Sequence, residues 1–402
     1  MRSLSQHPFE NKYLLNMKFR NDINGLRALA VMAVVFFHFK PDWLPGGFAG
    51  VDVFFVISGF LMTSIIFNGL EKNNFNLFEF YTARANRIIP VIVAACAVLA
   101  VFGWFYLLPS DYQYLAKQIQ KSLFFNSNLF FAHEGNYFDV HSQSKWLLHT
   151  WSLSVEWQFY IFFPIFLLLL KRFISLSRLK VWVLGLFLLS FSYSVYLSHR
   201  DSQLAYFVLS SRAWEMLLGG LAFLYPVAIQ RLKYRVVTQI LGLVLIIASY
   251  FLISEKTVWP GYMALIPVFG AYLIIISQFE NNRLLNNPIF NKLGAWSYSI
   301  YVWHWPLLVM GLYFAMEDWW MCGIPLAILL GFLSYHYIEK IKLPKYQAWR
   351  DIYKVKPLYG LLCMALLALL IRHSNGLDFE SYGRGAAVSA QTKFIDYYKK
   401  QH

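Results

Sequence analysis

Apolar segments of membrane-spanning length recur along this chain and leave few folds open to it. Eleven segments come close to the roughly 20 residues that a helix needs to cross a bilayer. They cover residues 23–39, 48–69, 88–108, 146–170, 179–198, 203–226, 236–253, 261–277, 295–315, 319–338 and 357–373. Only 14% of the residues are charged, against about 25% in soluble domains. The sequence therefore predicts an all-α polytopic membrane protein with about ten to eleven transmembrane helices.

The 35 lysines and arginines are unevenly distributed between the segments that would face the two sides of the membrane. With the N-terminus in the cytoplasm, 22 fall in the inner loops and N-terminal segment and 6 in the outer loops. This excess is the positive-inside pattern of membrane proteins. The net charge of +14 thus indicates topology and contact with membrane lipid, and we expect no nucleic-acid partner.

The order of these segments predicts five parts. They are a cytoplasmic lead-in without a cleavable signal (1–20), the main transmembrane domain (21–340), a basic cytoplasmic loop (341–356), an additional transmembrane helix (357–373) and a flexible extracytoplasmic tail (374–402). The long outer segment 109–145 is rich in aromatic and amide side chains. It suits a lid that binds sugar rings or, alternatively, an interfacial helix.

The three cysteines, Cys96, Cys322 and Cys363, all lie in apolar spans. Their positions offer neither a disulfide framework nor metal-ligand spacing, so no metal is predicted. We expect all three to be buried as small apolar residues.

Ionisable side chains at membrane depth give the strongest functional signal, because charge is costly there. The stretch 24–61 places Arg27, His38 and Asp52 in or beside the first two spans. Arg27 and His38 are eleven residues apart, so both project from one helix face, about 16 Å apart along the axis. We expect a polar track across the bilayer, with these three as candidate site residues.

The fourth span adds His149, Ser152 and Glu156, which share one helix face at spacings of three and four residues. Glu156 either orients an imidazole or a basic residue, or forms a structural ion pair with Arg27 or Arg212. His149 is a supporting candidate.

Other ionisable groups have structural interpretations. Arg212 and Glu215 are three residues apart and are expected to neutralise each other. His304 is expected to be a satisfied polar contact in the bundle, and Glu339 to anchor arginines near the inner surface.

Arg84 and Arg87 lie one helical turn apart where the third span begins. One interpretation is ordinary positive-inside snorkelling. The other is a phosphate-binding pair, since guanidinium groups bind phosphate oxygens with directed hydrogen bonds.

Several motifs follow one another in a fixed order along the chain. They are NGLRALAVMAVVFFH, GGFAGVDVFFVISGFL, FYTARANRIIP, LLHTWSLSVEWQFY, SRAWEMLLGG, YSIYVWHWPLL and LSYHYIE. Together they resemble one family, the acyltransferase-3 group of bacterial integral-membrane O-acyltransferases, and the resemblance covers about residues 20–373.

This resemblance implies transfer of an acyl group, usually acetyl, from cytoplasmic acetyl-CoA or another acyl-CoA. The acceptor would be a hydroxyl of an envelope glycan or lipid-linked saccharide, such as lipopolysaccharide O-antigen or an exopolysaccharide, at a bacterial inner membrane. The family's Arg-x10-His motif falls on Arg27 and His38, with the histidine as base. Its Arg-x-x-Arg motif, thought to engage CoA, falls on Arg84 and Arg87.

The family's Ser-Val-Glu motif ends at Glu156. The chain departs from the family pattern at Asn24, where Asp is common, and at Trp157, where a second Glu is common. Many relatives carry an SGNH hydrolase-like domain after the last span, and no Gly-Asp-Ser motif appears here. Either the protein works without that domain or the sequence is truncated.

The chemistry leaves alternatives. His38 acts either as a general base or as the carrier of an acetyl group. The polar Arg/His/Glu track also suits an exporter of acyl groups or of another solute. In a third arrangement, the chain delivers the acyl group to a separate extracytoplasmic transferase.

Overall fold

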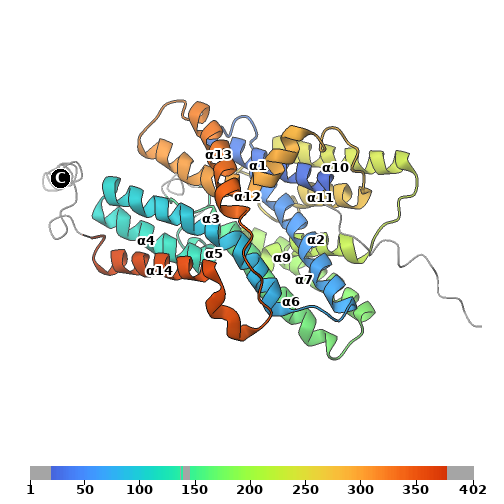
Figure 1. Ribbon diagram of the computed structural model, residues 1–402. Coiled ribbons are helices and arrows are strands. Elements are labelled where there is room, and N and C mark those ends of the chain that lie inside the picture. Colours follow the sequence, from blue (N-terminus) through green and yellow to red (C-terminus); the bar gives the residue numbers. More distant parts are fainter. Residues whose placement is uncertain (1–19, 136, 139–144, 378–402) are drawn as a thin grey trace, which may run out of the picture.

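The computed structural model describes residues 20–135, 137–138 and 145–377, which form helices joined by short loops (Figure 1). No strand occurs among these residues, and the prediction of an all-α fold is confirmed. The predicted lead-in, most of the predicted tail and part of the outer segment lie outside the described residues, at 1–19, 378–402, 136 and 139–144.

Fourteen helices can be followed in the described part of the chain. They are α1 (Asn21–Phe39), α2 (Gly50–Glu71), α3 (Leu77–Tyr106), α4 (Pro109–Leu123), α5 (Ser127–Phe131), α6 (Thr150–Lys171), α7 (Leu176–Arg200), α8 (Ser202–Phe207), α9 (Leu209–Leu224), α10 (Leu232–Leu252), α11 (Leu265–Ser277), α12 (Pro288–Tyr313), α13 (Trp320–Ser334) and α14 (Lys356–His373). A π-helical turn (Tyr335–Glu339) extends α13, and short 3₁₀ turns precede α2 and α14 (Gly47–Ala49 and Trp349–Lys354).

Eight of the described helices are long and apolar enough to cross a membrane, namely α1, α2, α3, α6, α7, α10, α13 and α14. The other three predicted spans are also helical. Of these, α9 and α11 are short, with 16 and 13 residues, and α12 has the length but a more polar sequence. All eleven predicted segments therefore form helices, as a multi-span membrane protein requires, because hydrocarbon offers the backbone no hydrogen-bond partners.

Neighbouring helices pack in pairs around the centre of the molecule. Helix α1 packs against α12 and α2, α2 against α9, and α10 against α11, while α14 lies along α3 and α4 (Figure 1). The pair α2–α9 is very close, because a Cβ atom at Gly59 would lie 1.8 Å from the carbonyl oxygen of Met216. Small residues allow this approach where membrane helices pack through their backbones.

Glycines on both α1 and α12 allow an equally close backbone approach between these two helices. A Cβ atom at Gly25 would lie 1.9 Å from the backbone oxygen of Leu285, just before α12, and one at Gly294 would lie 1.9 Å from that of Asn24. The side-chain amide of Asn24 also donates to the carbonyl oxygen of Asn291 at 2.6 Å. The beginnings of the two helices are therefore held in a fixed relative position.

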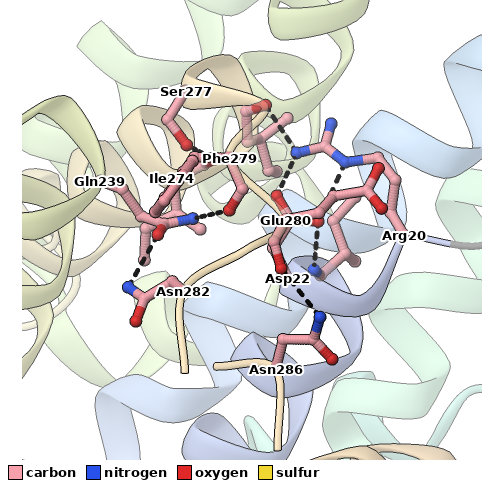
Figure 2. A network of polar contacts seen from close by, with 11 residues as sticks. Arg20, Asp22, Gln239, Ile274, Ser277, Phe279, Glu280, Asn282 and Asn286 are labelled. Atoms are coloured by element: carbon pink, nitrogen blue, oxygen red, sulfur yellow. Dashed lines mark hydrogen bonds and ion pairs between the residues drawn. The ribbon is translucent and has the colours of Figure 1, made fainter. Parts of the chain in front are cut away.

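A polar network continues this contact towards α10 and α11, as Figure 2 shows. Arg20 pairs with Asp22 at 2.6 Å and donates to the carbonyl oxygen of Ile275 at 2.9 Å. On the other side, Gln239 of α10 donates to the carbonyl oxygen of Phe279 at 2.8 Å, and Asn282 donates to Gln239 at 2.7 Å. The network ties the beginning of α1 to the last turn of α11, and the segment that follows α11 to α10.

In its described residues, the predicted outer segment forms two helices, α4 and α5. Its polar side chains gather at Glu134, which accepts hydrogen bonds from the Tyr114 hydroxyl at 2.7 Å and from Lys117 at 3.4 Å. Burial, with the neighbouring Glu134 carboxylate, raises the pKa of Tyr114. This segment covers one end of α3 and α6, and its proposed role in sugar binding stays a prediction.

Cys96 is buried, as predicted, but Cys322 and Cys363 are exposed on the outside of the bundle. The prediction is wrong for these two because α13 and α14 bury only one face, and an apolar run does not show which face that is. Among the described residues, no group of three His, Cys, Asp or Glu side chains is placed to hold a metal ion.

Candidate active site

A cavity between α1, α2, α3, α6 and α12 holds most of the candidate site residues. It contains about 770 Å³ of space not filled by atoms, counted out to its opening. Its polar lining consists of Arg27, Ser58, Arg84, Arg87, Ser152, Glu156, Tyr160, Ser297, Tyr298 and Tyr301. Five separate segments of the sequence contribute these side chains, and they meet only in the folded bundle.

Three arginines give this cavity a positive charge. Arg27 comes from α1, and Arg84 and Arg87 come from successive turns of α3. Within the described residues, neither Arg27 nor Arg84 has a hydrogen bond or ion pair, and Nε of Arg84 is buried without a partner. Arg87 lies 3.8 Å from Glu339, which confirms that Glu339 anchors an arginine. Among the described residues, these three guanidinium groups therefore have two carboxylates near them, Glu339 and the cavity-lining Glu156.

Glu156 lines the same cavity, but it does not form the predicted ion pair. Its Oε1 accepts hydrogen bonds from the hydroxyl groups of Ser58 and Tyr160. Neither Arg27 nor Arg212 lies within ion-pair distance of it in the described residues, so that interpretation is wrong. The rotation of α6 directs Glu156 toward hydroxyl donors of α2 and of its own next turn.

Ser152 and Tyr301 line the cavity at the end farther from the arginines. The Tyr301 hydroxyl donates to the backbone oxygen of His149 at 2.9 Å and lies 2.7 Å from the Ser152 hydroxyl. His304 follows Tyr301 by one turn of α12, and the His149 ring centroid lies 5.7 Å from that of His304. The cavity thus ends about one helical turn from a group of imidazoles.

The centre of this group is a contact between His38 and His304. Nδ1 of His38 lies 3.1 Å from Nε2 of His304, and the rings stack with centroids 5.1 Å apart. On its other side, Nε2 of His38 lies 2.9 Å from the hydroxyl oxygen of Tyr137. The Trp305 ring packs edge-on against His38 at 4.9 Å. His304 is a satisfied polar contact, as predicted, and its partner is the predicted base.

Asp52 lies apart from His38, in an ion cluster between α2 and α9. Arg212 pairs with Asp52 at 2.9 Å and with Glu215 at 2.8 Å, and all three side chains are almost fully buried. The predicted Arg212–Glu215 pair is confirmed, and Asp52 is an additional partner. Arg212 also lies over the ring of Trp151 at 5.5 Å. This cluster joins two helices, and a role for Asp52 in the reaction stays a prediction.

The structure thus gathers six of the seven candidate residues in one continuous region. Arg27, Arg84, Arg87 and Glu156 line the cavity, and His38 lies beyond its far end. His149 reaches the same region through its backbone oxygen and ring, while Asp52 does not. Sequence reasoning missed Tyr137 and the contact of His304 with His38. The histidine of the motif YSIYVWHWPLL, which is His304, was the sequence feature that could have indicated this contact.

Comparisons with known proteins agree with this arrangement. A family model described as an acyltransferase domain matches residues 20–336. A Staphylococcus aureus protein, provisionally named an O-acetyltransferase, is 31% identical over 348 residues, covering 80% of this chain and 57% of that protein. Peptidoglycan O-acetyltransferase OatA of Listeria monocytogenes is 31% identical over 347 residues, covering 80% and 55%. No solved structure matches.

BcsY of Komagataeibacter xylinus, provisionally named a membrane-bound transacylase, is 32% identical over 327 residues, covering 80% of this chain and 82% of BcsY. The chain spans little more than half the length of the two O-acetyltransferases. The family match nevertheless covers most of the chain and all the residues that line the cavity. The resemblance noted in the sequence is confirmed, and this chain belongs to the acyltransferase domain family.

Proposed function

We propose that this chain is a membrane O-acyltransferase. It moves an acyl group, in the simplest case acetyl, from cytoplasmic acyl-CoA to a hydroxyl of a cell-envelope carbohydrate. One observation carries the proposal: a cavity with three guanidinium groups ends about one helical turn from a buried imidazole pair. An anionic, elongated donor that delivers a reactive group to a base fits this arrangement.

The arginines suit the phosphates of CoA. Guanidinium groups bind phosphate oxygens through charge-assisted hydrogen bonds, and Arg27 and Arg84 have no such partners among the described residues. With the N-terminus in the cytoplasm, the arginine end of the cavity faces the cytoplasmic supply of acetyl-CoA. Arg27 precedes His38 by eleven residues of α1, or about 16 Å, a distance the pantetheine arm would bridge.

His38 then acts on the acceptor. A neutral imidazole takes the hydroxyl proton as the acceptor oxygen attacks the thioester carbonyl carbon. The carbon–sulfur bond breaks, and the proton passes to the sulfur to give CoA with a free thiol. The aromatic side chains of Trp305 and Tyr137 around His38 limit access of water, which would otherwise hydrolyse the thioester.

The proposal also includes the class of acceptor and the membrane in which the protein lies. OatA is named for O-acetylation of peptidoglycan, and the relatives above are bacterial. These names support an envelope glycan or lipid-linked saccharide as acceptor, such as O-antigen or exopolysaccharide, at the bacterial inner membrane. A separate extracytoplasmic transferase is the alternative recipient of the acyl group.

The test uses isotope-labelled acetyl-CoA and inverted membrane vesicles, whose exposed face is cytoplasmic. Label is followed into envelope glycans for the wild type, His38→Ala, Arg84→Ala and a control, Arg178→Ala, which changes an exposed arginine of α7. Wild type and control should transfer label, His38→Ala should not, and Arg84→Ala should need more donor. Transfer that does not depend on His38 would overturn the mechanism. Labelled solute crossing the membrane without glycan labelling would favour the exporter.

A further inference from the structure

We propose that His304 is a positioning residue that holds His38 in one tautomer, with the lone pair on Nε2. The inference rests on the proposed function, in which His38 is the base. It concerns which nitrogen of His38 receives the proton, and it follows from three contacts along one line, from α12 through α1 to Tyr137.

The first contact fixes the proton of His304. Its Nδ1 lies 2.5 Å from the backbone oxygen of Tyr301. A carbonyl oxygen only accepts hydrogen bonds, so Nδ1 of His304 carries a hydrogen and donates it. The ring is fully buried, and no water is needed to satisfy this nitrogen.

The second contact, between His304 and His38, determines which nitrogen of His38 carries the hydrogen. A neutral imidazole has a single N–H, so Nε2 of His304 carries a lone pair. A charged ring would be costly here, because among the described residues no carboxylate hydrogen-bonds to either imidazole. Since Nε2 of His304 accepts, Nδ1 of His38, 3.1 Å away, must donate.

The third contact shows where the base points. With its hydrogen on Nδ1, His38 presents the lone pair of Nε2 to the Tyr137 hydroxyl, which donates at 2.9 Å. A general base must lie within about 2.6–3.2 Å of the oxygen whose proton it removes. The Tyr137 oxygen therefore marks the direction from which an acceptor hydroxyl would approach Nε2 of His38.

The contact between His38 and His304 also persists during the reaction. When Nε2 of His38 takes the acceptor proton, the ring becomes an imidazolium, and its Nδ1–H still donates to Nε2 of His304. In serine proteases a carboxylate has this orienting role. Here a neutral imidazole supplies the acceptor without placing an uncompensated carboxylate in the membrane.

Two substitutions of His304 separate this role from simple packing. His304→Gln can retain both interactions, with its amide N–H donating to Tyr301 and its amide oxygen accepting from His38. His304→Met has a flexible apolar side chain and can do neither. His336→Met is the matched control. Nδ1 of His336 also contacts a backbone oxygen, that of Phe332, at 3.1 Å, but this histidine is exposed and contacts no imidazole in the described part of the chain.

In the labelled acetyl-CoA assay, His304→Met should lower kcat by about 10- to 100-fold, by analogy with the cost of removing a group that orients a metal-binding histidine. The KM for acetyl-CoA should not change, since the cavity arginines remain. His304→Gln should recover most of kcat, and His336→Met should match the wild type. A wild-type kcat in His304→Met, or equal losses in the Gln and Met variants, would overturn the proposal.

A second measurement does not depend on activity. In protein labelled with ¹⁵N-histidine, the ring-nitrogen shifts of His38, assigned by difference from His38→Gln, show which nitrogen is protonated. We expect Nδ1–H in the wild type and in His304→Gln. In His304→Met we expect a larger share of Nε2–H than in the wild type, although the backbone oxygen of Val34, which also contacts this ring, remains as an acceptor. Protonated Nε2 in the wild type would refute the inference. Absence of transfer with the expected shifts would refute only the proposed function.

Discussion

Replacing Arg84 by methionine should stabilise the ligand-free protein and weaken donor binding. Nε of Arg84 is buried without a partner, and Arg87, with the same charge, lies three residues away. A buried unsatisfied donor costs about 1–3 kcal/mol, and a like-charge pair one turn apart adds a few tenths. The free energy of unfolding of Arg84→Met should therefore exceed that of the wild type by about 1–3 kcal/mol.

Once CoA is bound, the Arg84 side chain should instead stabilise the complex. A hydrogen bond to a charged group contributes about 1.5–3 kcal/mol, so the Kd for CoA should rise by about 10- to 150-fold. Thermal unfolding in detergent, with and without CoA, measures both effects. CoA at 100 times the wild-type Kd stabilises the wild type by about 2.7 kcal/mol, but a variant with a 100-fold higher Kd by only about 0.4 kcal/mol.

Arg87→Met is the control, because Arg87 is 37% exposed and already lies 3.8 Å from Glu339. Its removal relieves no buried unpaired group, so the ligand-free protein should gain no stability. The reasoning would be refuted if Arg84→Met were less stable than the wild type while its Kd for CoA stayed the same.

Three other changes test the helix packing. Arg212→Gln leaves two facing carboxylates and should cost about 3–5 kcal/mol, whereas Asp52→Asn leaves one carboxylate for one guanidinium and should cost much less; equal losses in thermal unfolding would contradict this. Gly59→Ala puts a methyl group 1.8 Å from a backbone oxygen of α9 and should cost about 1–3 kcal/mol or more, and a wild-type unfolding temperature would argue against the close packing. Maleimide treatment in detergent should label the exposed cysteines of α13 and α14 but not Cys96, as counted by mass spectrometry; a third adduct would show that the core opens.

The sequence predicted the helices well because a membrane allows few alternatives. An apolar run of sufficient length must be helical in hydrocarbon, whatever its neighbours are. The sequence could also have predicted that Arg27 lies near Arg84 and Arg87. The family motifs mark these three residues, and their spacing puts them on helix faces. For the same reason Arg212 and Glu215, one turn apart on α9, were paired correctly.

Contacts between distant helices were not predictable in this way. Successive residues on a helix differ by about 100° in direction, so a small rotation of the helix changes which partner a side chain meets. Glu156 meets Ser58 rather than an arginine, and Asp52 meets Arg212 rather than His38. The contact of His38 with His304 joins residues 266 positions apart, and no periodicity in the sequence links them.

The close contact between the beginnings of α1 and α12 has a mechanical consequence for these imidazoles. His38 lies thirteen residues beyond Gly25, or about 20 Å along α1, so a tilt of about 3° moves it by about 1 Å. A shift of that size directed away from His304 would lengthen the 3.1 Å contact beyond hydrogen-bond range. The glycine contacts and the polar network of Figure 2 thus hold the beginning of α1 in place, and a small change in tilt there becomes a larger displacement at His38. The alignment of two side chains deep in the bundle is set by backbone spacing at its edge.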